Sequence, residues 1–181
     1  MTVLGLDLSL TATGICRLAD GSPELTTVGS KGHTKDTIGL RAYRLRVLAD
    51  LVLAAVAIDK PDLVIVEGPS VMSKGGSNWD RAGLWWHVVG ALHAMELPTA
   101  IVPPSTLKKW AAGKGNADKA TVAVHLARLW PDVTAADDNQ WDALALATMG
   151  AQWLGRSTPT RAHHAASLAG GEWPERLTVA S

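Results

Sequence analysis

Two short apolar segments of the chain each end on an acidic residue. Residues 3–8 read Val-Leu-Gly-Leu-Asp-Leu and residues 63–67 read Leu-Val-Ile-Val-Glu, which places Asp7 and Glu67 at or near the ends of these runs. Short apolar runs bounded by turn-forming residues are typical of strands that are buried on both faces. A carboxylate on such a strand is destabilising unless a cation, a metal ion or hydrogen-bond donors compensate its charge. Both acids are therefore candidates for a metal site.

Two further acids stand at the start of the last strongly helical segment. Asp138 and Asp142 are four residues apart, so they share one face of a helix. If the two strands are neighbours and the helix crosses their ends, all four carboxylates converge. A ligand set made only of oxygen atoms suits Mg²⁺ or Mn²⁺, not Zn²⁺. Two such ions are the usual apparatus of in-line phosphodiester cleavage, in which one activates water and the other stabilises the leaving 3′-oxygen.

Asp138 taken alone has a simpler explanation, because the dipole of a helix favours an acid in its first turn. Asp142 resists that explanation, since it interrupts an otherwise apolar stretch of the same segment. The conjunction of the four acids points to a metal site more specifically than any one of them does.

A lysine-bearing segment precedes this helix. Lys108, Lys109, Lys114 and Lys119 lie within it, and the glycines of residues 112–116 supply backbone N–H groups that can approach a phosphate closely. Lys119 is placed to offset charge on the scissile phosphate in the transition state. The alternative, that these lysines are merely solvated, is strongest for Lys108 and Lys109. Because the formal net charge is +0, DNA binding would depend on this local patch and would fall steeply with salt.

The hydrophobic pattern predicts a three-layer α/β domain. Strands are expected at residues 3–8, 14–19, 25–30, 63–67 and 99–102, and helices at 37–58, 79–95, 105–110, 117–129 and about 138–154. Turn residues at positions 20–23 favour an antiparallel pairing of the first three strands, and right-handed crossovers bring in the later two. The result is a mixed five-stranded sheet flanked by helices.

The domain is expected to span residues 1–155. Periodicity fades beyond it, so residues 156–181 are expected to form a loosely packed tail in which His163 and His164 are solvated.

Composition restricts the setting in which the protein works. The single Cys16 excludes a disulfide framework and favours a reducing compartment. Residues 1–8 do not resemble a signal peptide, and the apolar stretch at residues 47–58 is too short to cross a bilayer. We therefore expect a cytoplasmic protein that has no membrane partner.

Together the motifs resemble those of the RuvC family of Holliday-junction resolvases. The resemblance is carried by residues 5–9 with Thr13-Gly14, by residues 64–67 and 142–147, and by the basic stretches 104–109 and 113–119, in the family's order and spacing. It implies an RNase H-like fold, a homodimer and Mg²⁺-dependent cutting of branched DNA such as a four-way junction. It also implies that Asp7, Glu67 and Asp142 are metal ligands, with two ions in each active site.

The chain departs from the family's pattern at two places. The family's remaining ligand lies three residues before the last aspartate, where this chain has Asn139, so either Asp138 or Asn139 is the expected fourth ligand. The family often places an aromatic wedge in the loop after the second acid, where only Met72 or Val71 of this chain could serve. Ser70 and Met72 are the expected DNA contacts of this loop. The resemblance further implies that the helix at residues 79–95 forms the dimer contact.

The function that we expect is paired symmetric nicking of four-way junctions, which leaves 5′-phosphate and 3′-hydroxyl ends. Three other functions are considered beside it. The first is an RNase H-like nuclease acting on RNA, on RNA–DNA hybrids or on branches formed in replication and packaging. The second is a non-catalytic module that binds branched DNA. The third, a sugar-kinase or actin-like ATPase, is disfavoured because 181 residues are too few for its two lobes.

Overall fold

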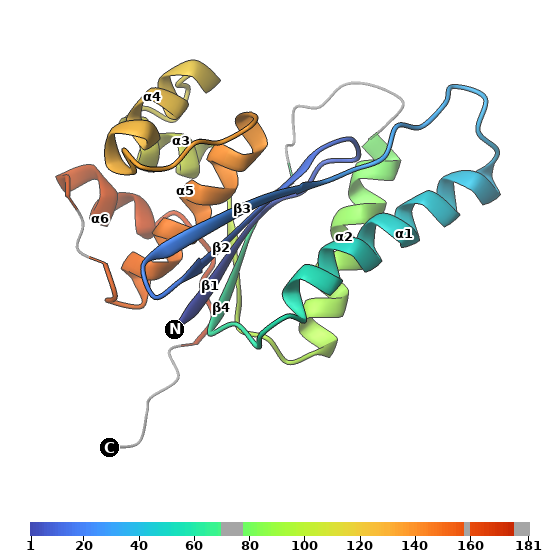
Figure 1. The fold of residues 1–181 in the computed structure, drawn as a ribbon, viewed down its shortest axis with the longest axis horizontal. Coiled ribbons are helices and arrows are strands. Elements are labelled where there is room, and N and C mark those ends of the chain that lie inside the picture. The colour runs from blue at the N-terminus through green and yellow to red at the C-terminus, as the bar shows by residue number, and fades with distance from the viewer. Residues whose placement is uncertain (70–77, 158–159, 176–181) are drawn as a thin grey trace.

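A mixed five-stranded sheet forms the centre of the chain, which a computed structural model describes for residues 1–69, 78–157 and 160–175 (Figure 1). Its strands are β1 (Thr2–Asp7), β2 (Thr13–Ala19), β3 (Ser22–Val28), β4 (Leu63–Glu67) and β5 (Thr99–Val102), in the order β3-β2-β1-β4-β5. The pairs β1–β2 and β2–β3 are antiparallel, whereas β1–β4 and β4–β5 are parallel. The predicted sheet, with its first three strands antiparallel, is confirmed.

Helices cover both faces of this sheet (Figure 1). One face carries α1 (Ile38–Val56) and α2 (Asn78–Ala94), and the other carries α3 (Pro104–Ala112), α4 (Lys119–Leu129), α5 (Asp138–Trp153) and α6 (Ala162–Leu168). Alternation along β1 explains the two layers: Leu4 and Leu6 join the core with α1 and α2, while Val3 joins the core with α3, α4 and α5. A strand buried on both faces reads as continuously apolar, which is why the sequence around Asp7 does so.

The hairpin between β2 and β3 corrects one predicted boundary. The sequence predicts a third strand from residue 25, but β3 begins at Ser22 because the turn contains only Asp20 and Gly21, with φ of 50° and 84°. Two consecutive residues with positive φ make a tight turn whose twist suits a hairpin. Pro23 is tolerated inside β3 because this strand lies at the edge of the sheet.

The expectation of a loosely packed tail is wrong for its described part. Residues 162–168 form α6, which lies against α3, and His164 is 3% exposed rather than solvated. Its ring stacks on that of Trp110 with centroids 4.7 Å apart. Seven residues are too few to show an amphipathic period, so the helix left no signal in the sequence.

The same segment covers the free edge of β5. Glu172 exchanges two backbone hydrogen bonds of 2.8 Å with Ile101, and Trp173 stacks on Trp153 at a centroid separation of 5.2 Å. Backbone groups at a sheet edge otherwise remain open to another chain.

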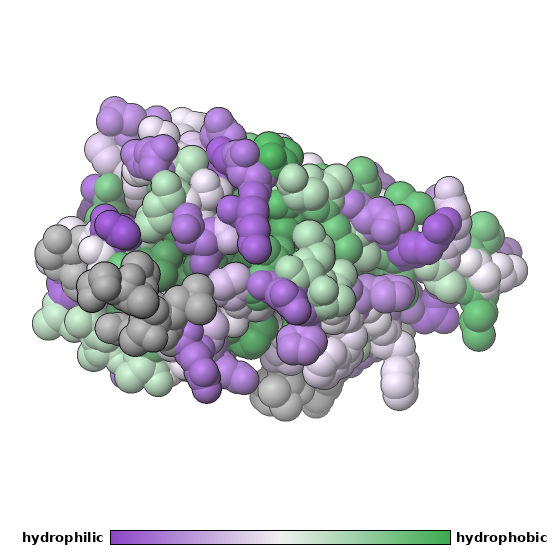
Figure 2. Space-filling model, turned by 90° about the horizontal axis from the view of Figure 1, so that it is seen from below, coloured by the Kyte–Doolittle hydropathy of each residue, from purple (hydrophilic) through white to green (hydrophobic). Residues whose placement is uncertain are grey.

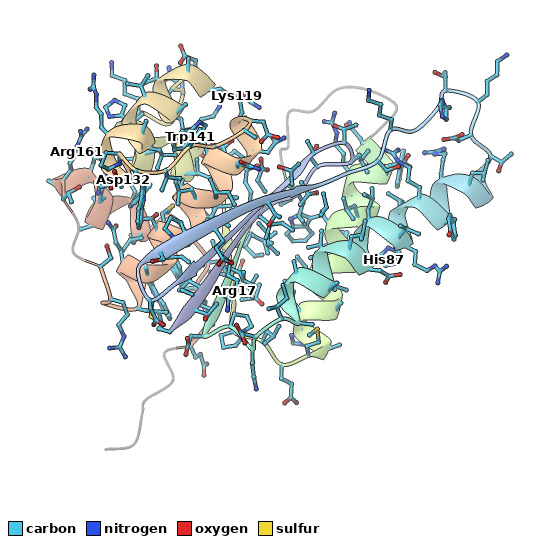
Figure 3. The ribbon with its side chains drawn as sticks, in the orientation of Figure 1. Arg17, His87, Lys119, Asp132, Trp141 and Arg161 are labelled. Carbon is cyan, nitrogen blue, oxygen red and sulfur yellow. The ribbon has the colours of Figure 1, made fainter. Side chains whose placement is uncertain are left out.

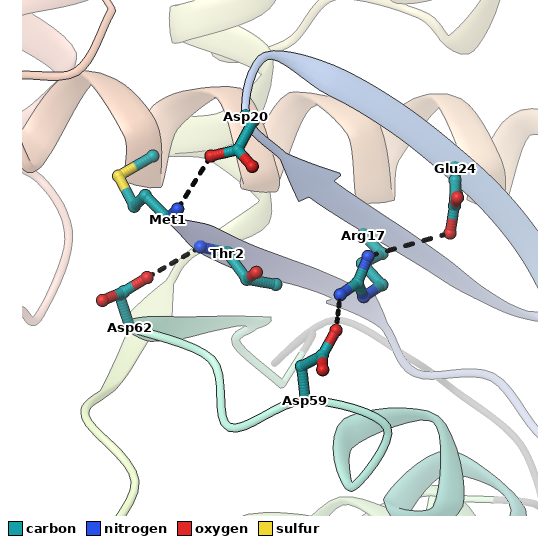
Figure 4. A network of polar contacts seen from close by, with 7 residues as sticks. All are labelled: Met1, Thr2, Arg17, Asp20, Glu24, Asp59 and Asp62. Atoms are coloured by element: carbon teal, nitrogen blue, oxygen red, sulfur yellow. Dashed lines mark hydrogen bonds and ion pairs between the residues drawn. The ribbon is translucent and has the colours of Figure 1, made fainter.

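Polar contacts tie down the amino end of β1 (Figure 4). The amino group of Met1 lies 2.9 Å from Asp20, the N–H of Thr2 donates to Asp62 at 2.7 Å, and Arg17 pairs with Asp59. Seen from below, the molecule carries hydrophilic side chains dispersed among apolar ones (Figure 2). No helix in the described part of the chain is long and apolar enough to cross a membrane.

Candidate active site

Parallel pairing of β1 and β4 brings the two strand-end acids together. The register pairs Leu6 with Val66, so Asp7 and Glu67 come next on adjacent strands at the same edge of the sheet. The indole N–H of Trp85, on α2, donates to the backbone carbonyl of Glu67 at 2.9 Å and fixes the end of β4. The sequence predicts this neighbourhood, because carboxyl ends of parallel strands share an edge.

Helix α5 reaches the same edge because two glycines let it lie directly on the strands. A Cβ on Gly5 would come within 2.1 Å of the backbone oxygen of Ala143, and one on Gly14 within 2.0 Å of that of Asn139. Only glycine permits such a close approach of helix and strand backbones. Since Gly14 lies opposite Asp7 in the β1–β2 register, the first turns of α5 stand beside Asp7.

The start of α5 is set by its cap. Asp137 accepts a hydrogen bond from the N–H of Gln140 at 2.9 Å, as an N-cap residue does. Asp138 is therefore the first residue of the helix, and Asp142 follows one turn later on the same side.

The three inner carboxyl groups lie close enough to perturb one another. Burial raises the pKa of Asp7, and burial together with the charge of Asp7 raises the pKa of Glu67 to about 9. Burial and the charge of Asp7 also raise the pKa of Asp142 to about 7. A hydrogen bond between their side chains lowers the pKa of Asp7 and raises that of Glu67, so Glu67 is the one of the pair that holds a proton more readily.

Two of the predicted lysines supply positive charge at this cluster. Lys119, at the start of α4, lowers the pKa values of Asp7 and Asp142, and its Nζ lies 3.5 Å from Asp138. Lys108, half-buried on α3, acts in the same direction on Glu67 and Asp142. Figure 3 shows Lys119 close to the first turn of α5. The spacing of the two lysines in the sequence does not predict that both lie near the acids, since α3 and α4 are separate elements.

The other predicted DNA contacts are less close to the acids or cannot be placed. Lys109 and Lys114 are exposed, and neither forms an ion pair with the described residues. Ser70 and Met72 lie outside the described residues.

The two candidates for a fourth ligand differ in their surroundings. The side chain of Asp138 is 53% exposed and faces Lys119, whereas the backbone of Asn139 is pressed against Gly14. Asp138 adds to the negative potential felt by Asp142. Both remain candidates.

The donor set suits a hard divalent cation. It consists of carboxylate oxygens, and burial of several acids at one place is unfavourable without positive charge to compensate it. In the described part of the chain, no three His, Cys, Asp or Glu side chains are gathered as they are around a bound metal ion. Burial raises the pKa of both Asp7 and Glu67, and the charge of Asp7 raises that of Glu67 further. A bound cation would lower these pKa values.

Comparison with known proteins identifies the fold and the family likeness. A sheet of this order, with helices on both faces and α5 docked across β1 and β2, has the RNase H-like fold that the sequence predicts. The structure of Thermus thermophilus RuvC in complex with a Holliday junction matches it with a TM-score of 0.68 and 22% identity, covering 88% of this chain and 99% of that one. The yeast mitochondrial Holliday junction resolvase Ydc2 matches with a TM-score of 0.55 and 13% identity, covering 85% of this chain and 79% of that one.

Sequence comparison finds relatives that carry the same name. The crossover junction endodeoxyribonuclease RuvC of Zymomonas mobilis is 29% identical over 170 residues, which are 94% of this chain and 95% of that protein. The RuvC of Parvibaculum lavamentivorans is 28% identical over 148 residues, 81% of this chain and 84% of that protein. No family model matches the chain. The resemblance to RuvC that the motifs predicted is thus confirmed along almost the entire chain.

Proposed function

We propose that the chain is a metal-dependent, structure-selective endonuclease that resolves Holliday junctions by paired symmetric nicks. The observation that carries the proposal is the convergence of Asp7, Glu67 and Asp142 at one edge of the sheet, with Lys119 beside them. The two relatives named as crossover junction endodeoxyribonucleases, and the RuvC solved with a Holliday junction, support branched DNA as the substrate.

The three inner acids would hold Mg²⁺, for which Mn²⁺ should substitute, with Asp138 or Asn139 as a fourth ligand. Two such ions, when bound, would supply an activated water and stabilisation of the leaving 3′-oxygen. Glu67 would become a ligand by losing its proton when metal ions bind, because a nearby cation lowers the pKa that burial has raised.

The lysines act on the DNA and not on the ions. Lys119 sits at the rim of the acid cluster, where its ammonium group can meet the scissile phosphate and offset charge that develops there. Its ion pair with Asp138 holds the side chain in position before DNA arrives. Lys108 adds charge next to it, while Lys109 and Lys114 extend the same basic surface along the DNA backbone.

Symmetric nicking needs two active sites, and α2 is the proposed dimer contact. Trp86, on this helix, is 67% exposed, and it lines an apolar groove of about 460 Å³ together with Val89 and Leu97. Exposed tryptophan beside an apolar groove is typical of protein interfaces. A second copy of the same chain would cover it, and the protein would act in the cytoplasm of a bacterial or phage-infected cell.

Cleavage of synthetic substrates tests the proposal. Purified protein is incubated with a four-way junction, a flap, a linear duplex and an RNA–DNA hybrid, in Mg²⁺ and in EDTA. Paired nicks in the junction that require Mg²⁺ are expected. Absence of metal-dependent junction cutting contradicts the proposal, and preferred cutting of the hybrid would favour the RNase H-like alternative. Binding without cutting would identify a non-catalytic module.

The fourth ligand is tested separately with Asp138→Asn and Asn139→Ala. Only the variant that loses a ligand should abolish cutting while leaving junction binding intact. The exposed Asp132→Asn, which lies outside the acid cluster, is the matched control and should cut normally.

A further inference from the structure

A second polar cavity lies on the opposite side of the sheet from the lysines. It has a volume of about 560 Å³ and is lined by residues 9–11 after β1, residues 32–36, and the first turns of α1 and α2. In Figure 1 these segments meet near the end of the sheet to which β1 and β4 run. Because residues 9–11 lie two to four positions after Asp7, the cavity lies near the end of β1 that carries Asp7.

Arg44 is built into the wall of this cavity. Its Nη2 donates to the backbone carbonyls of Leu10, at 3.2 Å, and Ser30. A Cβ on residue 32 would come within 2.4 Å of its Nη1, so Gly32 allows the guanidinium to lie flat against the loop. Its Nε is buried and has no hydrogen-bond partner among the described residues.

The charge of Arg44 is therefore incompletely compensated. Carbonyl oxygens accept two of its hydrogen bonds, and no carboxylate in the described chain forms an ion pair with it. A partly buried cation without a counter-ion is costly, and an anion in the cavity would relieve that cost.

Two more arginines face the same cavity. Arg41 forms a double contact with Asp80, at 3.1 and 2.5 Å, which holds α1 against α2. Arg81 follows on α2, is exposed, and forms no ion pair with the described residues. Asp36 also lines the cavity, but its carboxylate accepts a hydrogen bond from the N–H of His33 at 2.8 Å. Arg41 and Asp80 neutralise each other, so Arg44 and Arg81 stand against Asp36 alone.

We infer that this arginine cavity binds a backbone phosphate of the DNA strand that crosses the acid cluster. Guanidinium groups bind phosphate oxygens in pairs, and the hydroxyl groups of Ser9 and Thr11 add neutral donors. The lysines approach that strand from α3 and α4, and the arginines approach it from α1 and α2. A strand held on both sides of the scissile bond is kept in line with the attacking water. This inference rests on the proposed function and specifies how its substrate is held.

Junction binding tests the inference with a matched pair of variants. Binding of a fluorescent four-way junction is measured by anisotropy in Ca²⁺, over a range of salt concentrations, for the wild type, Arg81→Ala and Arg46→Ala. Arg46 is exposed on α1, lies 5.4 Å from the ring of Tyr43 and does not line the cavity. Arg81→Ala should weaken binding about tenfold and reduce the salt slope by about one, as loss of one phosphate contact does. Arg46→Ala should bind as the wild type does.

Inorganic phosphate provides a readout that does not require a junction. Millimolar phosphate should raise the melting temperature of the wild type and of Arg46→Ala, and should do so less for Arg81→Ala. Equal junction affinity and equal phosphate response in all three proteins would overturn the inference while leaving metal-dependent junction cutting untouched. If the wild type fails to bind junctions but the phosphate response depends on Arg81, the anion site stands and the proposed function falls.

Discussion

Replacement of Asp142 by asparagine should stabilise the metal-free protein at alkaline pH. Burial and the neighbouring charge raise the pKa of this carboxyl from 3.8 to about 7, so the folded protein binds its proton more tightly than the unfolded chain does. Ionisation therefore works against folding: stability falls as pH rises from about 4 to about 7 and is level above that. The asparagine side chain keeps the volume and one acceptor oxygen of the carboxyl group, replaces the other oxygen by an NH2 donor, and carries no charge.

The size of the effect follows from the pKa difference. A shift of one pKa unit corresponds to about 1.4 kcal/mol, so the wild type loses about 2 kcal/mol from this group at pH 5 and about 4 kcal/mol at pH 8. These are upper limits, because partial exposure of Asp142 lets water screen its charge. The difference in unfolding free energy between Asp142→Asn and the wild type should therefore grow by roughly 2 kcal/mol between these pH values.

Urea unfolding in EDTA at pH 5 and pH 8 measures this difference. Asp132→Asn, an exposed replacement outside the cluster, should show no such growth. Addition of Mg²⁺ at pH 8 should stabilise the wild type and not Asp142→Asn, because a ligand has been lost. If Asp142→Asn is no more stable than the wild type at pH 8, the carboxyl is not held in a repulsive buried cluster and the reasoning for the metal site fails.

Three further changes test the arrangement around the acids. Gly14→Ala should destabilise the protein by about 1–3 kcal/mol in urea unfolding and abolish cutting, because the new methyl group pushes α5 away from β2. Lys119→Met should lower the single-turnover cleavage rate about a hundredfold, with a much smaller effect on junction affinity, if it stabilises charge in the transition state. Trp86→Glu should convert a dimer into a monomer in sedimentation velocity, since it places a charge in the proposed apolar contact.

Each of these three variants has a matched control at another position of the chain. Gly39→Ala adds a methyl group to α1 that meets only the Thr37 hydroxyl, at an ordinary van der Waals distance of 3.9 Å, and should be neutral or slightly stabilising. Lys109→Met removes an exposed charge away from the acids and should change affinity more than rate. Val124→Glu, at a 49% exposed site on α4, should leave the oligomeric state unchanged. Equal effects within any pair would contradict the role assigned to its first member.

The sequence predicts the acid cluster well because its signals are local. Asp7 and Glu67 interrupt apolar runs, and the parallel pairing of those runs follows from the helix between them. Asp142 interrupts an apolar helix in the same way. Two adjacent aspartates, Asp137 and Asp138, could each cap that helix, and the structure assigns the cap to Asp137.

Features that depend on distant contacts were not predictable in the same way. In the sequence Arg44 is one of several basic residues on a predicted helix. Only the fold shows that its guanidinium group lies against the loop around Gly32. The sequence predicts Lys108 as a DNA contact, but only the position of α3 shows that its charge lowers the pKa of Glu67. The packing of α6 depends on Trp110, which lies far away in the chain.

The hydrogen bonds between Glu172 and Ile101 have a consequence for synthesis of the chain on the ribosome. β5 is complete about 70 residues before its edge partner is made, and translation at about 5–20 residues per second leaves that edge open for several seconds. During that interval the apolar strand is free to pair with another nascent chain. β3, at the other edge, carries Pro23 and Glu24 and is protected as soon as it emerges. A chain truncated before Glu172 should therefore aggregate during expression, even though its acid cluster is intact.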